Sequence, residues 1–192
     1  MTVVNAPPFS RAVRKMTVPR HPSLKRLTEL WMLEVKEFGL ASLGRLSARD
    51  LQYFYGVFKD SLVARGPKIG PFRLSFIGTD LESHIGRRII NAEIGDCFDL
   101  KQAREIERAL IDAVERHKPL LLDVWLKGAG KQRLKAEFLC LPFFEAEMEK
   151  ADPQSHSTTI FGILAIEDLP ALPPDPLHRE LAIEQMSFIG LN

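Results

Sequence analysis

The stretch from Phe72 to Gly86 constrains the fold of this chain most, because it predicts a strand that leads directly into a short helix. Its first apolar residues recur with the period of two that is typical of a strand with one buried face: Phe72, Leu74 and Phe76. Gly78 permits backbone angles closed to other residues, and Thr79 precedes Glu82 by the spacing of a capping box. Such a unit forms the wall of a pocket and carries no obvious catalytic group.

Composition predicts one ordinary globular domain with extensions. The chain has 192 residues, of which 45% are hydrophobic and 27% charged. A net charge of +1 argues against a nucleic-acid partner, and the absence of an apolar run of about 18 residues argues against a transmembrane segment. Two isolated cysteines, Cys97 and Cys140, fit a reducing compartment and no zinc cluster. We therefore expect a cytoplasmic protein.

The charges divide the chain into three parts. Six basic and no acidic residues fall within 1–26, which predicts a basic N-terminal arm over 1–22. This arm is either solvated or docks on an acidic partner, a lipid surface or the chain's own tail. The domain is predicted over 23–168. Residues 169–192 read as an acidic, proline-rich tail whose last segment, 177–192, could form a short docked element.

Three helices are predicted in addition to the short helix that follows Gly78. The first follows Pro22 with Ser23 as N-cap, and its apolar stripe either packs on its own domain or pairs with a second copy through Leu27, Trp31 and Val35. A short second helix begins near Ser47. The third starts at Asp99, which has capping-box spacing to Gln102, and ends before Pro119.

Five apolar runs separated by turn residues predict five strands: 57–64, 72–77, 120–127, 133–144 and 158–166. The last three are joined in sequence by loops, as in an antiparallel meander. Strands and helices in this order place the chain in the α+β class.

This order of elements resembles a PAS domain. The stretches that carry the likeness are Leu30–Leu33, Asp50-Leu51, Arg73–Thr79, Gly86–Arg88, Leu141-Pro142 and Phe161–Leu164. They are similar to a family of single-PAS-domain proteins found largely in alphaproteobacteria, formerly catalogued as a domain of unknown function. The resemblance implies an α+β fold: a five-stranded antiparallel sheet with short helices, one long helix on one face, and an N-terminal cap helix. It further implies sensing or protein interaction rather than turnover.

The resemblance places a ligand pocket on the concave face of the sheet, and we expect its lining to be Leu74, Phe76, His84, Ile106, Leu110, Trp125 and Phe138. A small-molecule ligand or a protein partner there would shift the cap helix between docked and released states, and a homodimer is expected. Two alternatives stay open: a constitutive scaffold or adaptor whose pocket is filled by side chains, and an enzyme of unrecognised type. No phosphate-loop, nucleophile-elbow or zinc-protease motif occurs, so we expect no catalytic residues.

The cofactor and the ligand are not identified by the sequence. Haem is disfavoured because His117, near the end of the long helix, is explained by the helix dipole and no second polar feature marks a porphyrin site. His84 is interpreted as a satisfied surface or core histidine. Flavin is disfavoured because Asp96 and Phe98 flank Cys97 where the light-sensing PAS motif has asparagine and arginine. No metal site is expected.

Overall fold

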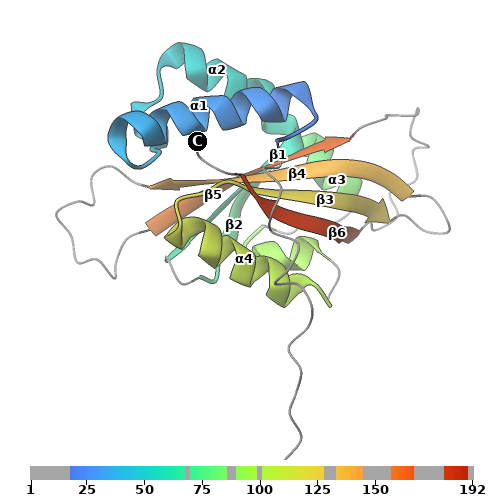
Figure 1. Ribbon diagram of the computed structural model, residues 1–192. Coiled ribbons are helices and arrows are strands. Elements are labelled where there is room, and N and C mark those ends of the chain that lie inside the picture. Colours follow the sequence, from blue (N-terminus) through green and yellow to red (C-terminus); the bar gives the residue numbers. More distant parts are fainter. Residues whose placement is uncertain are drawn as a thin grey trace, which may run out of the picture.

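Six antiparallel strands form one sheet in the order β2-β1-β5-β4-β3-β6, with helices on both faces (Figure 1). The structure is a computed structural model that describes residues 18–67, 70–85, 90–98, 101–127, 133–144, 157–166 and 180–189. The strands are β1 (Ser61–Pro67), β2 (Arg73–Ile77), β3 (Leu120–Lys127), β4 (Arg133–Phe144), β5 (Ser157–Ile166) and β6 (Glu180–Phe188). The predicted α+β class and antiparallel sheet are confirmed, and the strand count is six rather than five.

Two helices cover the upper face of the sheet in Figure 1. They are α1 (Pro22–Phe38), which is the predicted cap helix, and α2 (Ala48–Gly56), joined through the short 3-10 helix η2 (Leu43–Arg45). The apolar face of α1 is buried against one side of the sheet in a cluster that includes Leu24, Leu27, Trp31, Leu121, Leu139 and Phe161. This stripe therefore packs on its own domain.

The opposite face is covered by α4 (Ala103–Glu115), together with the 3-10 helix η4 (Ile94–Cys97) and residues of α3 (Thr79–Ile85). Helix α4 begins at Ala103 rather than at the predicted Asp99. Its buried residues contact a second apolar cluster of the sheet: Ile106, Leu110, Ala113 and Val114. The sheet thus lies between two separate hydrophobic layers.

Strand β6 corrects the prediction of a tail over 169–192. Residues Glu180–Phe188 pair with β3 along its whole length, so they belong to the sheet. The amide of Gln102, at the N-cap of α4, holds this strand: its Nε2 donates to the Ile183 carbonyl at 2.8 Å and its Oε1 accepts from the Ile183 N–H at 2.7 Å. The predicted capping box at Gln102 is therefore wrong, because its side chain serves β6 instead. Residues 1–17 and 167–179, most of the predicted arm and tail, lie outside the described residues.

The strand predicted over 57–64 begins later. Residues Phe58–Asp60 form the 3-10 helix η3, and β1 starts at Ser61. Gly78 is needed for close approach and not for a special backbone angle, because a Cβ on it would lie 2.2 Å from the Phe58 carbonyl oxygen and 2.4 Å from that of Lys59. The chain between β2 and α3 is therefore pressed against η3. No helix in the described part of the chain is long and apolar enough to cross a membrane.

Candidate functional site

The N-terminus of α1 is held by one buried carboxylate of the sheet. Glu137 of β4 has no exposed surface, and its oxygens accept hydrogen bonds from the backbone N–H of Arg20 at 2.9 and 3.0 Å and from that of His21 at 2.8 Å. His21 is the N-cap of α1 and makes no side-chain cap of its own. A carboxylate here satisfies open helix N–H groups and interacts favourably with the helix dipole. Glu137 therefore caps α1 from a distant part of the sequence.

Arg20 completes this anchor. Asp123 of β3 lies directly opposite Glu137 in the sheet, which places two carboxylates on neighbouring strands. Arg20 Nη2 contacts Asp123 Oδ1 at 2.5 Å, and Arg20 Nε lies 3.7 Å from Glu137 Oε1. A single guanidinium thus offsets the repulsion of the paired acids.

A second buried bond holds the middle of α1. Trp31, which has no exposed surface, donates from Nε1 to the carbonyl oxygen of Pro142 at 2.7 Å. Pairing of β4 with β3 ends at Leu120↔Cys140, so Pro142 lies beyond the end of β3 and, among the described strands, pairs only with Ile160 of β5. Helix α1 is therefore fixed to β4 at two points along its length.

The predicted pocket on the concave face is not a cavity. Four of its residues are almost completely buried in the layer beneath α4: Leu74, Ile106, Leu110 and Phe138. In this layer Phe138 also packs edge-on against Phe98, with ring centroids 5.7 Å apart. The side chains of the domain itself occupy this face.

Two other predicted lining residues lie on the opposite face. The pairing of β1 with β2 shifts between Val63 and Ala64, so Phe76 faces the α1 layer while Leu74 faces α4. Phe76 stacks on Phe58 at 4.1 Å between centroids. The neighbours of Trp125 on β3, Val124 and Leu126, belong to the α4 layer. Because successive side chains of a strand point to opposite faces, Trp125 faces the α1 side, where the ammonium of Lys135 lies over its ring. The predicted grouping is therefore wrong: a bulge moves Phe76 to the α1 side, and the regular alternation of β3 puts Trp125 there as well.

The remaining predicted residues are placed as follows. His84 lies in α3, but its side chain is outside the described residues. Of the predicted dimer face, Leu27 and Trp31 are buried against the sheet and Val35 is partly buried, so a second copy reaches the first two only if α1 leaves the sheet. His117, just past α4, packs edge-on against Phe144.

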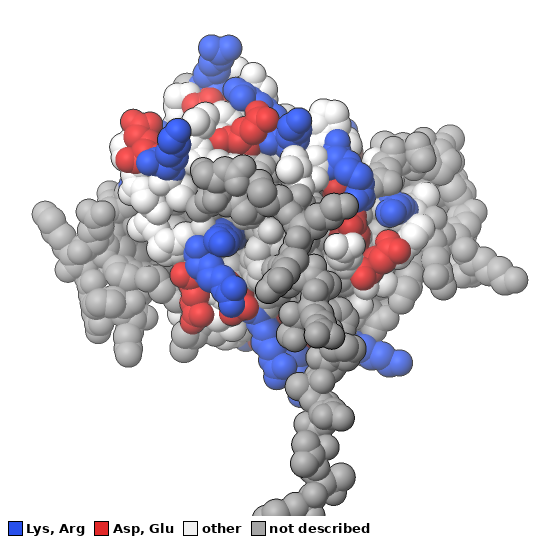
Figure 2. Space-filling model, in the orientation of Figure 1, with Lys and Arg blue, Asp and Glu red and all other residues white. Residues whose placement is uncertain are grey.

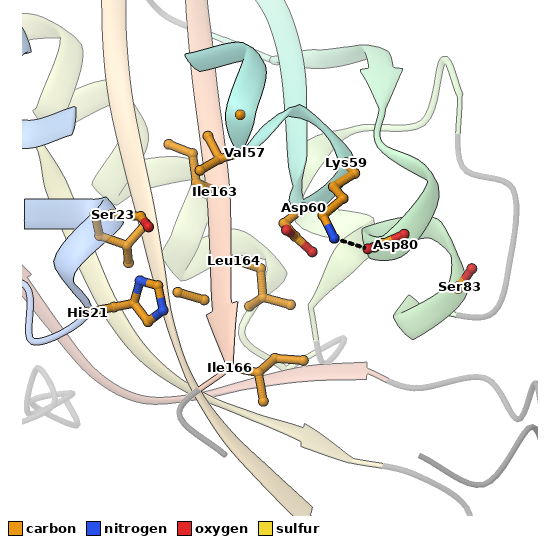
Figure 3. Close-up of a pocket in the computed structure, with 13 residues that line it drawn as sticks. His21, Ser23, Val57, Lys59, Asp60, Asp80, Ser83, Ile163, Leu164 and Ile166 are labelled. Carbon is orange, nitrogen blue, oxygen red and sulfur yellow. Dashed lines mark ion pairs between the residues drawn. The ribbon is translucent and has the colours of Figure 1, made fainter. Parts of the chain in front are cut away.

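A cavity of about 420 Å³ lies instead at the N-terminal end of α1 (Figure 3). One wall is the start of α1, and the others come from the end of α2, from η3, from α3 and from the last residues of β5. The lining residues are His21, Ser23, Leu24, Gly56, Val57, Lys59, Asp60, Asp80, Ser83, Ile163, Leu164, Ala165 and Ile166. The volume is that of a site for a small organic ligand.

The two sides of this cavity differ in polarity. Lys59, Asp60 and Asp80 line one side, and Figure 3 shows the ammonium of Lys59 directed at Asp80, 3.0 Å from its carboxylate. The hydrogen bond that the ammonium donates to this carboxylate raises the pKa of Lys59, so the ammonium is charged at neutral pH. On the other side, the buried Nδ1 of His21 has no hydrogen-bond partner among the described residues.

The sequence offered no signal for this cavity. It depends on η3, which occupies residues where the apolar run Val57 to Ala64 predicts a strand, and on a start of α1 that Glu137 fixes from 116 residues away. Only the short helix after Gly78 was correctly predicted as part of a pocket wall, through Asp80 and Ser83.

The described residues contain no group of three or more His, Cys, Asp or Glu side chains placed to hold a metal ion. Both cysteines are buried and neither forms a disulfide, and burial raises the pKa of the Cys140 thiol far above its ordinary value. Cys140 is therefore a core residue and not a nucleophile. On the face drawn in Figure 2, basic and acidic side chains lie side by side over the described surface.

No family model matches the chain, and no curated protein matches it. Among solved structures it is similar to the PAS domain of BvgS from Bordetella pertussis, with a TM-score of 0.41 and 16% sequence identity. The similarity covers 64% of this chain and 90% of that domain.

Proposed function

We propose that this protein is a non-catalytic sensor and interaction module of the PAS type in bacterial signalling. A ligand or partner that enters the cavity beside His21 would bias α1 between a docked and a released state. The observation that carries the proposal is that the first residues of α1 form a wall of this cavity. Anything bound there contacts α1 directly.

The coupling has a short physical route. Ala165 lines the cavity and pairs in the sheet with Glu137, which in turn accepts the N–H of His21, another lining residue. A ligand that displaces His21 or moves Ala165 would therefore strain the anchor of α1. It shifts the equilibrium only if it binds the docked and released states with different affinity.

Release of α1 would expose a surface through which the signal could pass to another protein. The stripe that contains Leu27, Trp31 and Val35 is covered by the sheet in the docked state, and its exposure would offer an apolar face to a protein partner or to a second copy in a homodimer. We place the module in the bacterial cytoplasm, since two buried cysteines outside any disulfide fit a reducing compartment.

One observation favours a constitutive adaptor as a second candidate. The concave face beneath α4 is filled by Leu74, Ile106 and Phe138, so this face leaves no room for a regulatory ligand. In an adaptor α1 would stay docked whatever occupies the cavity, and this difference can be tested.

The test fills the cavity with a side chain. Gly56 lines the cavity, and a Cβ built on it meets no atom within 4 Å, so Gly56→Trp adds an occupant without a main-chain clash. Gly44→Trp is the matched control, because Gly44 lies outside the lining and its Cβ would meet only Ser42 Oγ at 3.8 Å.

Hydrogen exchange followed by mass spectrometry is the measurement. We expect Gly56→Trp to change the exchange of the α1 amides severalfold while β3 and β4 stay protected, and Gly44→Trp to leave both unchanged. Equal exchange of α1 in the two variants and the wild type would support the adaptor instead. Native mass spectrometry of the purified protein would show in parallel whether a ligand or a second copy is bound.

A further inference from the structure

The end of β5 presents an open sheet edge inside the cavity. Pairing of β1 with β5 stops at Ser61↔Ile163, while pairing of β4 with β5 continues through Leu164 and Ala165 to Ala136↔Ile166. In the described part of the chain, no strand covers the β1 side of residues 164–166. The cause is η3, which turns the chain away one residue before β1 begins.

The residues that line the cavity also indicate that it faces the edge of β5. Successive side chains of a strand point to opposite faces of the sheet, so a cavity on one face meets every second residue. This cavity meets four in a row, Ile163 to Ile166, and therefore faces the edge of the strand (Figure 3). Along such an edge, alternate residues direct an N–H and a C=O outward.

We propose that this edge binds an extended polypeptide segment of about three residues, which adds to β5 as a short strand. The outward N–H and C=O groups are complementary to another extended main chain, in which donors and acceptors alternate at the same spacing. An apolar side chain of the segment enters the cavity between Leu24, Val57 and Leu164, and its polar neighbours face the exposed side with Lys59 and Asp80.

The site is suited to a peptide more than to a compact metabolite. It combines a backbone edge, an apolar floor and a charged rim, with the buried Nδ1 of His21 as a further hydrogen-bonding group. This inference deepens the proposed function, because it names the ligand class for the same cavity. The binding itself does not depend on any movement of α1.

The probe is the blocked tripeptide acetyl-Thr-Leu-Thr-amide, titrated into the full ¹⁵N-labelled chain and followed by NMR. We expect shifts of the amide signals of Leu164 to Ile166 and a dissociation constant on the order of 1 mM, because so short a strand buries little surface. Gly56→Trp, which adds a large side chain to the cavity lining, should weaken binding at least about tenfold, whereas Gly44→Trp should not.

N-methylated peptides make the test specific for strand addition. In an added strand only alternate amides face β5, so methylation of the leucine nitrogen and methylation of both threonine nitrogens must have opposite effects. We expect one pattern to abolish binding and the other to preserve it. Equal binding of both peptides, or no shift at Leu164 to Ile166 with the parent peptide, would overturn the inference.

The two proposals fail in different ways. If the peptides bind with the alternating pattern but the exchange of the α1 amides does not change, peptide addition to β5 is supported and the sensor mechanism is refuted. If Gly56→Trp changes the exchange of α1 but the peptide does not bind, peptide addition to β5 is refuted and the sensor mechanism is supported.

Discussion

Trp31 donates its indole N–H to the carbonyl oxygen of Pro142, 111 residues further along the chain, at 2.7 Å. Both groups are buried, so the bond replaces water on each side. It joins the cap helix to the central strand β4 at a proline, which has a carbonyl acceptor but no N–H of its own. The docked position of α1 thus depends on a specific polar contact as well as on apolar packing.

Trp31→Phe keeps an aromatic ring at this position and removes the indole N–H donor together with part of the ring. We expect a loss of about 1–3 kcal/mol in the free energy of unfolding, because the Pro142 carbonyl stays buried without a partner. Urea denaturation gives the value. Trp125→Phe is the control, since Trp125 is partly exposed on the same face of the sheet. Losses of equal size in the two variants would mean that ring volume, and not the hydrogen bond, matters.

The second anchor gives a separate prediction. Glu137→Gln keeps the shape of the side chain but removes the charge that caps α1, and we expect a cost of about 1–3 kcal/mol with faster amide exchange in the first turns of α1. Glu29→Gln removes an exposed partner of Arg26 and should change stability by no more than about 0.5 kcal/mol. If exchange in α1 stays at the wild-type rate, Glu137 does not hold the helix.

Regular alternation explains which parts of the fold the sequence predicts. The bounds of β3 and β4 agree with the predicted runs, because both strands alternate without interruption. Strand β6 was missed because its pairing shifts opposite Asp123 and Val124: its core contacts change from Leu181 and Ile183 to Met186 and Phe188, which breaks the period of two. Each bulge reverses the side-chain alternation, and no residue type in the sequence indicates where it occurs.

A bulge also explains one error in the predicted site. Phe76 was assigned to the face of Leu74 by alternation, and the bulge in β2 placed it on the other face. The observed cavity is formed by His21, Lys59 and Ile166, residues far apart in sequence. Such a site depends on how α1, η3 and β5 meet, which is tertiary packing that local patterns do not encode.

Strand β6 should depend on Gln102. Gln102→Glu keeps an acceptor for the Ile183 N–H but loses the donor to the Ile183 carbonyl, which then faces a carboxylate. We expect faster exchange of the β6 amides by about tenfold, corresponding to roughly 1.4 kcal/mol, with β4 unaffected. Gln185→Glu introduces the same charge at an exposed position of β6 and serves as control. A similar loss of protection in both variants would point to charge alone.

Gly78 tests the contact between η3 and the β2–α3 turn. Gly78→Ala places a methyl group within 2.4 Å of two backbone carbonyl oxygens, which cannot move as a side chain can. We expect a loss of about 3 kcal/mol in thermal or urea unfolding. Gly56→Ala, whose Cβ enters open space at the end of α2, should be neutral or slightly stabilising. A neutral Gly78→Ala would show that η3 is not pressed against this turn.

Glu107 should give the stability a defined pH dependence. Burial, the neighbouring Glu93 carboxyl and the charge of Asp96 raise the pKa of Glu107 in the folded state. Protonation therefore favours the fold, so the contribution is fully present below the pKa of the unfolded chain, about 4.3, and is lost as the pH rises through the folded-state pKa. At pH 7 the ionised side chain is destabilising, and Glu107→Gln should raise the free energy of unfolding by roughly 0.5 kcal/mol after solvent screening.

The difference between Glu107→Gln and the wild type should shrink towards zero near pH 4, the ordinary range of a glutamate pKa. Thermal unfolding followed by circular dichroism across this range measures it, with Glu184→Gln on the exposed side of β6 as the control. A gain that is the same at pH 4 and pH 7 would assign the effect to packing, and a loss at pH 7 would show that the ionised carboxylate stabilises α4.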